Sequence, residues 1–486
     1  MQANWWKTRG LQLFFGLFVL VFGYFKFTYH ELWKDEWQVW MMGRDMGWLE
    51  LFGNLYFEGH PALWYIYVKC WTYVYHLFPA FDQATILQVG HFMLAVAAFY
   101  WLLFRLRYPI WLKLSLLFSY FIFFEYGLVN RGYVLVLLLG FMLVERIADF
   151  RQKPWPVAIL LFLLCQVEVY STLMVAAFGV YLLAQKWVEL GWRKVWSDRA
   201  LLVCGGGAVL GGLVFLLTIF PYTEGRNLQA AFVEPFAADV VRTAFQGNFV
   251  NTFWLGVVPD TNAFGVSSLG LGLSAVVLLL VMYFFWRVRA VWISFIFFTL
   301  IFFLFSAGFY AGGVRQWGML FLYFVFCLHL WYDHRPKLLW DQRVILASFL
   351  LFQLIYTGRA VEKEFFFPFT NAKATGAFIA EKVPPEVPVV VINKFAATPV
   401  VGYAGRNFYA LPDGDPFSYF KWTERIYIPP EVELKLFGQF KKVRGIIILS
   451  YEGLDPQRYP NVQLWQSFDG FSLKNENYYL YTLPTE

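Results

Sequence analysis

Apolar segments long enough to cross a membrane follow one another along most of this chain, and they limit its fold more than any other feature. A helix needs about 20 apolar residues to cross a hydrocarbon core of about 30 Å. Apolar segments of 13 to 21 residues occur at 11–28, 84–104, 110–128, 132–147, 156–168, 169–185, 200–220, 267–286, 291–309, 317–332 and 344–358. The pair at 156–185 could also be one long kinked helix. With only 15% charged residues, the chain is predicted to be a polytopic α-helical membrane protein of about eleven transmembrane helices.

The basic residues between these segments indicate the orientation of the chain. Cytoplasmic loops usually carry the excess of Lys and Arg. All the basic loops fall on the side of the N-terminus if the apolar stretch 61–79 is not counted as a crossing. We therefore predict that 61–79 lies along the outer interface or enters it partly. This predicts a cytoplasmic N-terminus and an outer C-terminus, with a bacterial inner membrane and a periplasmic C-terminal domain as the default.

The net charge of +6 is explained by these loops. Their Lys and Arg residues are topology signals and contacts for anionic membrane lipids, so we do not expect nucleic acid as a partner. The four cysteines lie in apolar stretches without the spacing of metal ligands.

The composition changes at about residue 358, where prolines and charges become frequent. Short β-branched runs then alternate with helical patterns, which is typical of an α/β domain. We expect helices at 375–382 and 431–442, and strands at 387–392, 445–450 and 478–483. The chain is thus predicted to consist of a transmembrane domain over 1–358 and an extracytoplasmic α/β domain over 359–486.

Acidic residues gather in the first outer loop, 29–83, which carries Lys34-Asp35-Glu36-Trp37 and then Glu58-Gly59-His60-Pro61. A carboxylate beside a membrane helix must stay hydrated or paired. It could take a proton from an acceptor hydroxyl while the other groups orient a substrate. The alternative is a solvated loop without a chemical role.

This arrangement resembles the GT-C superfamily of membrane glycosyltransferases, in particular the branch of protein O-mannosyltransferases and bacterial aminoarabinose transferases. The resemblance is clearest over residues 10–150. It implies that Asp35 is the catalytic base with Glu36 as its catalytic neighbour, and that His60 positions substrate. The His-Pro-Pro-Leu motif of the family reads His60-Pro61-Ala62-Leu63 here, so its second proline is missing. The family also places the following helix along the membrane, as the charge pattern requires for 61–79.

Further candidates for binding substrate or lipid phosphate lie on the same predicted side. Glu125, Arg131 and Tyr133 share the loop between the third and fourth segments, where the family has another acidic residue. Arg131 could hold a phosphate by paired hydrogen bonds or contact lipid headgroups. Glu168 is an ionisable residue in an apolar context, which indicates either a functional group or an acid at a helix end.

Arg315 follows Gly312-Gly313 in an outer turn and enters the tenth segment. Glycines allow close approach of a ligand to the backbone, so we expect Arg315 to bind a lipid phosphate; a headgroup contact is the alternative. A divalent cation could be a cofactor, with Asp35 and Glu125 as candidate ligands. No set of residues in the sequence requires one.

The resemblance and the site residues together imply an inverting glycosyltransferase. It would move a sugar from a polyprenyl-phosphate donor to a hydroxyl of a glycan, lipid or protein acceptor on the outer face of the membrane. A lipid or solute transporter or flippase is an alternative, but such proteins usually carry internal repeats, and none is evident. A non-catalytic subunit of glycan assembly is the second alternative. The sugar and the acceptor stay open.

Overall fold

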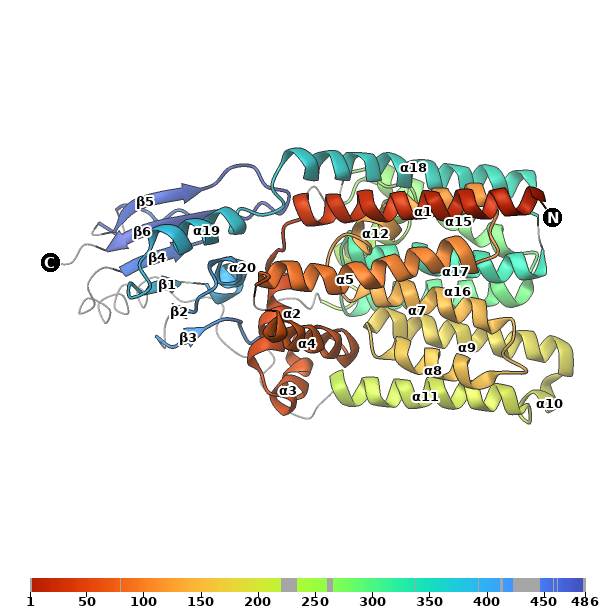
Figure 1. The fold of residues 1–486 in the computed structure, drawn as a ribbon. Helices are drawn as coiled ribbons and strands as arrows, with labels where there is room; N and C mark the ends of the chain where they lie inside the picture. The colour runs from red at the N-terminus through yellow and green to blue at the C-terminus, as the bar shows by residue number, and fades with distance from the viewer. Residues whose placement is uncertain are drawn as a thin grey trace.

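Long helices run side by side through most of the molecule, and a small sheet domain stands at one end of them (Figure 1). The computed structural model describes residues 2–78, 80–219, 234–259, 265–335, 337–391, 393–410, 414–422, 446–457, 459–460 and 462–483. In this part of the chain, eight helices are long and apolar enough to cross a membrane. They are α1 (Gln2–Tyr29), α5 (Gln83–Tyr100) with its π-helical extension η1 (Trp101–Arg105), α9 (Val169–Leu190), α11 (Arg199–Ile219), α15 (Ser268–Phe285), α16 (Arg289–Gly308), α17 (Val314–His334) and α18 (Trp340–Phe366). The predicted polytopic helical fold is confirmed, while the number of crossings stays a prediction.

The remaining predicted spans form shorter helices. The span expected at 110–128 is interrupted at Phe118 and Ser119, between α6 (Ile110–Leu117) and the π-helical turn η2 (Tyr120–Glu125). The spans at 132–147 and 156–168 become α7 (Tyr133–Ile147) and α8 (Pro154–Cys165). Residues 166–168 separate α8 from α9, so 156–185 contains two helices and not one.

Small residues allow α8 and α11 to approach closely. Gly207 lies against the backbone of Ala158, and Gly211 lies against the backbone of Phe162. Glycines four residues apart form such contacts in membranes because they let two helix backbones meet. This contact holds α8 beside the long α11 although α8 has only 12 residues.

The first outer loop forms α2 (Lys34–Asp45), α3 (Trp48–Glu58) and α4 (Ala62–Leu77), which gather where the bundle meets the sheet domain (Figure 1). The helix α4 has 16 residues and is not among the eight long apolar helices. Its Lys69 is buried and donates hydrogen bonds to the carbonyl oxygens of Gly43 at 2.9 Å and Met46 at 2.6 Å. Its position along a membrane surface stays a prediction.

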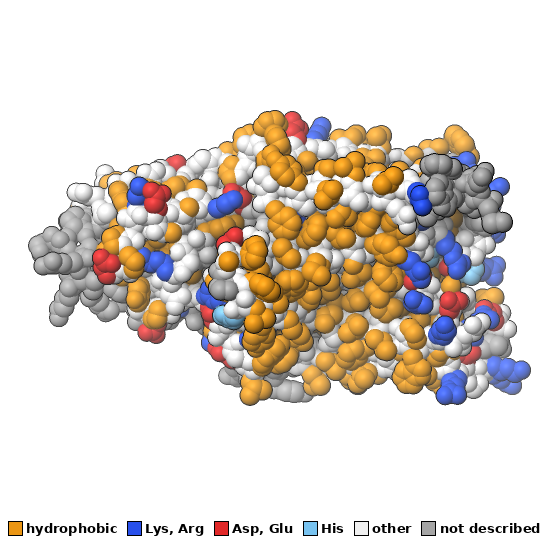
Figure 2. All heavy atoms as spheres, in the orientation of Figure 1, with side chains coloured by type: hydrophobic (Ala, Val, Ile, Leu, Met, Phe, Trp, Pro, Cys, Tyr) orange, Lys and Arg blue, Asp and Glu red, His pale blue; other side chains and the backbone are white. Residues whose placement is uncertain are grey.

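The two ends of the bundle differ in how many charged side chains they carry on the visible face (Figure 2). Hydrophobic side chains cover the middle of the visible face, and Lys and Arg gather at the end farthest from the sheet domain. The N-terminus and the short helix α10 (Trp192–Val195) lie at this same end (Figure 1). On this face, Lys and Arg are thus most frequent at the end of the bundle that carries the N-terminus, and which compartment each end faces stays a prediction.

The C-terminal domain contains a six-stranded mixed sheet of order β3-β2-β1-β4-β6-β5. Its strands are β1 (Val389–Val391), β2 (Phe408–Ala410), β3 (Pro416–Phe417), β4 (Ile446–Ser450), β5 (Gln463–Phe468) and β6 (Tyr478–Leu483). The strand β1 pairs parallel with β2 and β4, and the other pairs are antiparallel. Two helices, α19 (Ala372–Lys382) and α20 (Lys394–Ala404), pack against each other beside the sheet.

The predicted α/β domain is therefore confirmed, with α19, β1, β4 and β6 at the expected helix and strands. The helix expected at 431–442 lies outside the described residues. The last span, expected to end at 358, continues to Phe366 in α18. The expected domain boundary at 358/359 thus falls inside this helix.

Contacts between α20 and α2 dock the C-terminal domain on the bundle. The ring of Trp37 lies against Gly402, and its centre is 5.1 Å from that of Tyr403. The Tyr403 hydroxyl donates to the carbonyl oxygen of Leu32 at 3.1 Å. The domain is thereby fixed to the helix whose first turn carries the Asp-Glu pair.

Candidate active site

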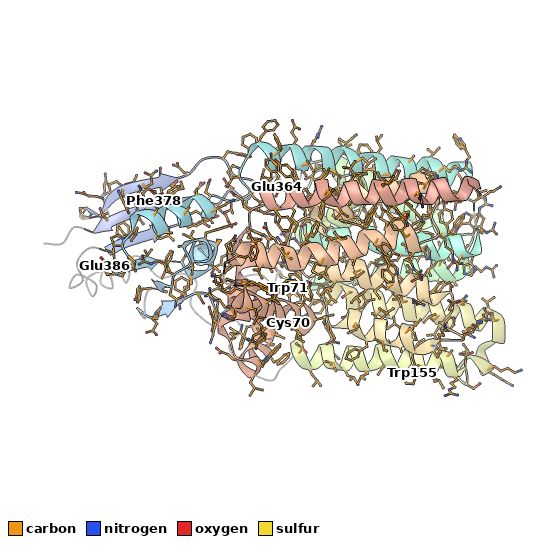
Figure 3. All side chains as sticks on the ribbon, viewed as in Figure 1. Cys70, Trp71, Trp155, Glu364, Phe378 and Glu386 are labelled. Atoms are coloured by element: carbon orange, nitrogen blue, oxygen red, sulfur yellow. The ribbon has the colours of Figure 1, made fainter. Side chains whose placement is uncertain are left out.

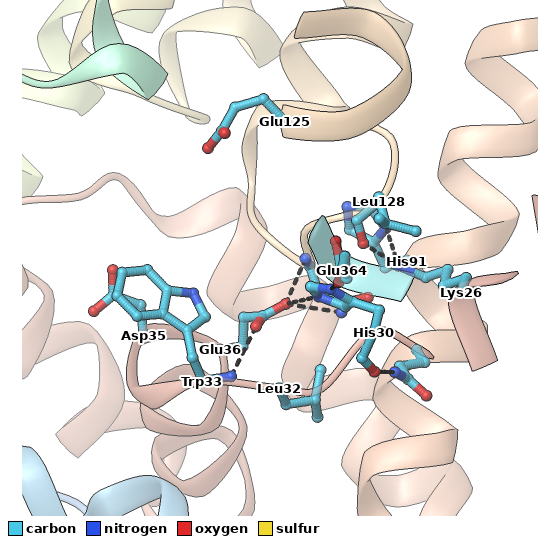
Figure 4. Close-up of polar contacts among 12 residues, drawn as sticks. Lys26, His30, Leu32, Trp33, Asp35, Glu36, His91, Glu125, Leu128 and Glu364 are labelled. Atoms are coloured by element: carbon cyan, nitrogen blue, oxygen red, sulfur yellow. Dashed lines mark hydrogen bonds and ion pairs between the residues drawn. The ribbon is translucent and has the colours of Figure 1, made fainter. Parts of the chain in front are cut away.

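Asp35 and Glu36 occupy the first turn of α2. Free backbone N–H groups and the helix dipole stabilise carboxylates at this position. The two side chains point to different surroundings (Figure 4). The Asp35 side chain is 27% exposed, whereas Glu36 is buried at 1%. Only Asp35 therefore faces space that a substrate could enter.

Two arginines from distant parts of the chain converge on Asp35. Its Oδ2 lies 2.5 Å from Nη1 of Arg131 and 3.6 Å from Nη1 of Arg315. The Nε of Arg315 also donates to Glu125 Oε1 at 2.7 Å, and the Tyr120 hydroxyl donates to Glu125 Oε2 at 2.8 Å. The structure thus brings Asp35, Glu125, Arg131 and Arg315 into one cluster, as their common predicted side required. Their roles stay predictions.

The electrostatics of this cluster keep Asp35 ionised. Burial alone would raise its pKa, but the positive charges of Arg131 and Arg315 outweigh burial and hold the pKa below its ordinary value. Arg315 itself lies in the first turn of α17, where the helix dipole disfavours a cation. Its carboxylate partners compensate for this position.

Glu36 takes part in a buried hydrogen-bond network (Figure 4). Its carboxylate accepts the backbone N–H of Trp33 at 2.9 Å, and the backbone and side-chain N–H groups of Asn130 at 2.6 and 2.8 Å. It also lies 3.1 Å from Nε2 of His30, whose Nδ1 is 2.5 Å from Glu364 Oε1. Glu364 belongs to the last part of α18, near the C-terminal domain (Figure 3).

The charged groups of this network shift one another's pKa values toward the charged forms. Burial would lower the pKa of His30, but Glu36 and Glu364 raise it to about 9. Burial would raise the pKa of Glu36, but the charge and hydrogen bond of His30 lower it to about 2. Glu36 therefore fastens the loop 126–132 to α2, and these contacts are those of a positioning group. The catalytic role predicted for Glu36 stays untested.

Lys26 provides a second attachment for the same loop (Figure 4). It is fully buried in α1, and its Nζ donates to the carbonyl oxygen of Leu128 at 2.5 Å and lies 3.3 Å from His91 Nδ1. A buried amine needs such partners because burying a polar group without hydrogen bonds is costly. The loop that carries Arg131 is thus held from both sides.

His60 and Glu168 form a pair in which His60 Nδ1 lies 2.9 Å from Glu168 Oε2. Burial would lower the pKa of His60, but the Glu168 carboxylate raises it above the ordinary value. Tyr133 is the first residue of α7, and its hydroxyl accepts a hydrogen bond from the side-chain amide of Gln316 at 3.3 Å. Gln316 follows Arg315 directly, and the Glu168 carboxylate lies against Gly132, the residue after Arg131. His60, Glu168 and Tyr133 therefore border the arginine cluster.

Glu58 is a further acidic group in this region, for which the sequence indicated no role. Burial raises its pKa to about 7. Its carboxylate accepts hydrogen bonds from Gln38 at 3.2 Å and from the Tyr65 hydroxyl at 3.4 Å. The Gln38 side chain also exchanges hydrogen bonds with the backbone of Phe420 in the C-terminal domain, at 2.8 and 3.3 Å. Its signals in the sequence were its place beside His60 and among the acidic residues of the first outer loop.

Four helices begin at residues of this region, namely α2, α7, α9 and α17. Helix N-termini present unpaired N–H groups and a partial positive charge. Together with the two arginines they favour an anionic ligand, a phosphate above all.

A mostly apolar cavity opens beside Val314, the first residue of α17. It is lined by Asn251, Leu255, Gly256, Val257, Val258, Pro259, Val314 and Tyr356. The ring of Tyr356 packs on that of Tyr120 with centres 4.7 Å apart, and Tyr120 holds Glu125. An apolar ligand in this cavity would thus end close to Arg315.

In the part of the chain that the structure describes, no group of three or more His, Cys, Asp or Glu side chains is arranged so that it could hold a metal ion, and His30 instead contacts both Glu36 and Glu364 directly. Asp35 and Glu125 each contact an arginine. Their participation in binding a divalent cation stays a prediction.

The chain matches no protein-family model and no curated protein sequence. It is similar to the crystal structure of ArnT from Cupriavidus metallidurans bound to undecaprenyl phosphate, with a TM-score of 0.57 and 11% identity over 97% of this chain and 98% of that chain. The apo structure of the same protein matches with a TM-score of 0.56 and 11% identity over 99% of both chains.

This similarity extends over the bundle and the C-terminal domain together. The chain therefore has the same fold as ArnT, and the resemblance indicated by the short motifs is confirmed at the level of the fold.

Proposed function

We propose that this protein is an inverting glycosyltransferase that moves a sugar from a polyprenyl-phosphate donor to an acceptor hydroxyl. The observation that carries the proposal is the convergence of Arg131 and Arg315 on the partly exposed Asp35. A base next to two phosphate-binding groups is what transfer from a phosphate-linked sugar needs. The similarity in fold to ArnT bound to undecaprenyl phosphate supports the choice of donor.

The donor phosphate would bind between the two guanidinium groups. Each can form paired hydrogen bonds with phosphate oxygens, and the converging helix N-termini add to the attraction. The first isoprene units of the lipid would lie in the apolar cavity beside Val314. The sugar would then face Asp35, with His60, Glu168 and Tyr133 at the border of its binding site.

Donor binding would also change the strength of the base. Without donor, the arginines lower the pKa of Asp35, which makes it a weak base. A phosphate that competes for these arginines would loosen both ion pairs and raise that pKa again. Asp35 would therefore accept protons best when the donor is in place.

In the transfer step, the acceptor oxygen attacks the anomeric carbon while its proton passes to Asp35. The bond between this carbon and the phosphate oxygen breaks, and its electron pair leaves with the phosphate. The charge that grows on the phosphate is stabilised by Arg131 and Arg315. A single displacement from the opposite face inverts the anomeric configuration. The acceptor is a glycan, a lipid or a protein on the outer, periplasmic side.

A transfer assay in liposomes tests this proposal. The purified protein is incubated with a panel of undecaprenyl-phosphate-linked sugars and hydroxyl acceptors, and the products are analysed by mass spectrometry and NMR. We expect a product of inverted configuration from the wild type and none from Asp35→Asn. Glu50→Gln serves as the matched control, because Glu50 is a 46% exposed acid of the same outer loop, and this variant should keep full activity.

Equal transfer by the wild type and Asp35→Asn would overturn the role of Asp35. Movement of the lipid-linked sugar across the bilayer without any covalent change would instead identify a flippase. Loss of glycan assembly in cells without any transfer by the purified protein would favour a non-catalytic subunit.

A further inference from the structure

A lysine of the C-terminal domain reaches the arginine cluster of the membrane domain. Lys474 lies in the loop between β5 and β6, where the backbone N–H of Lys474 donates to the carbonyl oxygen of Phe369 at 3.0 Å. The neighbouring N–H of Leu473 donates to that of Pro368 at 3.1 Å. These bonds fix the loop against the segment that follows α18. The position of Lys474 is therefore set by the connection between the two domains.

The side chain of Lys474 shares an aromatic ring with Arg315. Its Nζ is 4.3 Å from the ring centre of Trp33, and the guanidinium carbon of Arg315 is 5.2 Å from the same centre. Trp33 directly precedes α2. Burial, and then repulsion by Arg315, lower the pKa of Lys474 below its ordinary value, in agreement with this proximity. The ammonium group thus lies within the electrostatic reach of the candidate active site.

The positively charged ammonium group of Lys474 is not in direct contact with any carboxylate of the described residues. Among the described residues its ammonium forms no hydrogen bond or ion pair, only contacts over the rings of Trp33 and Phe369. Glu125 is bonded to Arg315, and Asp35 is shared by the two arginines. Lys34, the other lysine nearby, pairs with Glu476 at 3.9 Å.

The cluster itself thus contains three cationic groups and two carboxylates. Glu36 and Glu476 also attract Lys474, but their carboxylates are hydrogen-bonded to His30 and Thr370. A half-buried cation without an anionic partner is unfavourable. Binding a ligand that adds one negative charge beside Lys474 would therefore be favourable. A phosphate that already contacts two arginines would supply this charge and would still have oxygens available for an ammonium.

We propose that Lys474 is a third phosphate-binding group of the donor site, supplied by the C-terminal domain. This inference rests on the proposed function, because it takes the ligand to be the phosphate of a polyprenyl-linked donor. It follows that the donor site is complete only while the C-terminal domain is docked on α2. The domain is then part of donor binding in addition to any contact it makes with the acceptor.

Lipid binding to the purified full-length protein tests the inference, with undecaprenyl phosphate and the uncharged undecaprenol as probes. We expect the wild type to prefer the phosphate, and Lys474→Met to lower the affinity for it by about tenfold or more, the effect of losing one charge-assisted hydrogen bond. Affinity for undecaprenol should not change, and Lys474→Arg should retain most of the preference. Lys373→Met is the control, because Lys373 is 53% exposed and pairs with Glu31 at 3.8 Å across the same domain contact.

A labelling experiment on the wild type avoids any effect of substitution on folding. An amine-specific reagent is applied with and without lipid, and modification of each lysine is measured by mass spectrometry. Undecaprenyl phosphate should protect Lys474 and leave Lys373 equally reactive, while undecaprenol should protect neither. A Lys474 that does not react in the lipid-free protein also contradicts the inference, because the group must be open to the phosphate.

The failure of this inference can be told apart from that of the proposed function. If the wild type shows no preference for the phosphate, both fail together. If the wild type prefers the phosphate but Lys474→Met binds it equally well, or Lys474 is labelled equally with and without it, only the assignment of Lys474 is overturned.

Discussion

Replacing Glu36 by glutamine should lower the free energy of unfolding of the protein. The substitution leaves in place every residue that we propose to face the substrate. The glutamine carbonyl can still accept hydrogen bonds from Asn130, but its amide nitrogen would oppose the backbone N–H of Trp33, which now donates to the carboxylate at 2.9 Å. His30 would at the same time lose one of its two carboxylate partners. The variant therefore tests whether Glu36 positions the loop that carries Arg131.

The magnitude follows from these contacts. Breaking one partner of a buried ion pair costs about 3–5 kcal/mol, and a buried N–H without an acceptor costs about 1–3 kcal/mol. Because the groups are coupled and not additive, we expect a total of about 3–5 kcal/mol. This is a large fraction of the stability of most proteins.

The pH dependence of the protein's stability provides an independent test of the same prediction. The pKa of Glu36 falls from 4.5 to about 2 on folding, so its contribution is present above 4.5 and is lost as the pH falls toward 2. The pKa of His30 rises from 6.5 to about 9, so its contribution is present below 6.5 and is lost as the pH rises through 9. The stabilisation by the pair of Glu36 and His30 should therefore be greatest between pH 4.5 and pH 6.5.

Unfolding in detergent, followed by intrinsic fluorescence over a pH series, measures both effects. Glu36→Gln should unfold at clearly lower temperature or denaturant concentration than the wild type and should depend less on pH. Glu50→Gln should change stability by only about 0–1 kcal/mol, since its exposed ion pair contributes little. A Glu36→Gln variant as stable as the wild type would refute the positioning role.

Three further predictions follow from the geometry of the site. Arg315→Lys keeps the charge but loses the planar guanidinium, so transfer should fall by about ten- to a hundredfold while the protein stays folded; full activity in the liposome assay would contradict this. Burial raises the pKa of Glu58 from 4.5 to about 7, so the wild type should lose stability relative to Glu58→Gln as the pH rises between these values and show no further change above them. Parallel pH curves for the two proteins would contradict that assignment. Gly402→Val would push a side chain into the ring of Trp37, so limited proteolysis should cleave between the domains faster than in the wild type, and an unchanged rate would contradict the docking role of this contact.

The positions of the long apolar helices could be predicted well because membrane spans have a required length and apolar composition. The segments 200–220 and 267–286 match α11 and α15 to within a residue or two. The end of α18 was missed because Glu362, Lys363 and Glu364 interrupt its apolar pattern. The structure accommodates Glu364 by its contact with His30, which no local pattern could show.

The interruption at Phe118 and Ser119 was not predictable either. Neither residue is a strong helix breaker, and the residues next to them, 116–117 and 120–124, are apolar or aromatic. The interruption and the turn η2 nevertheless direct Glu125 toward Arg315. Polar residues in apolar surroundings were thus found from the sequence, but their partners were not.

The same limit applies to the candidate site. Asp35, Arg131 and Arg315 were identified by their common predicted side and by the resemblance to a known motif. Lys474 follows Arg315 by more than 150 residues and lies in another domain, so only the packing of that domain brings the two together. A lysine in a loop carries no sequence signal that distinguishes it from a solvated one.

The central claim is that a lipid phosphate binds between Arg131 and Arg315 beside Asp35. A cryo-electron microscopy structure of the protein with undecaprenyl phosphate tests it most directly. We predict phosphate density within hydrogen-bond distance of both guanidinium groups, longer contacts from these arginines to Asp35, and a lipid tail in the cavity beside Val314. Phosphate density at the basic end of the bundle, with both arginines still paired to Asp35, would contradict the account.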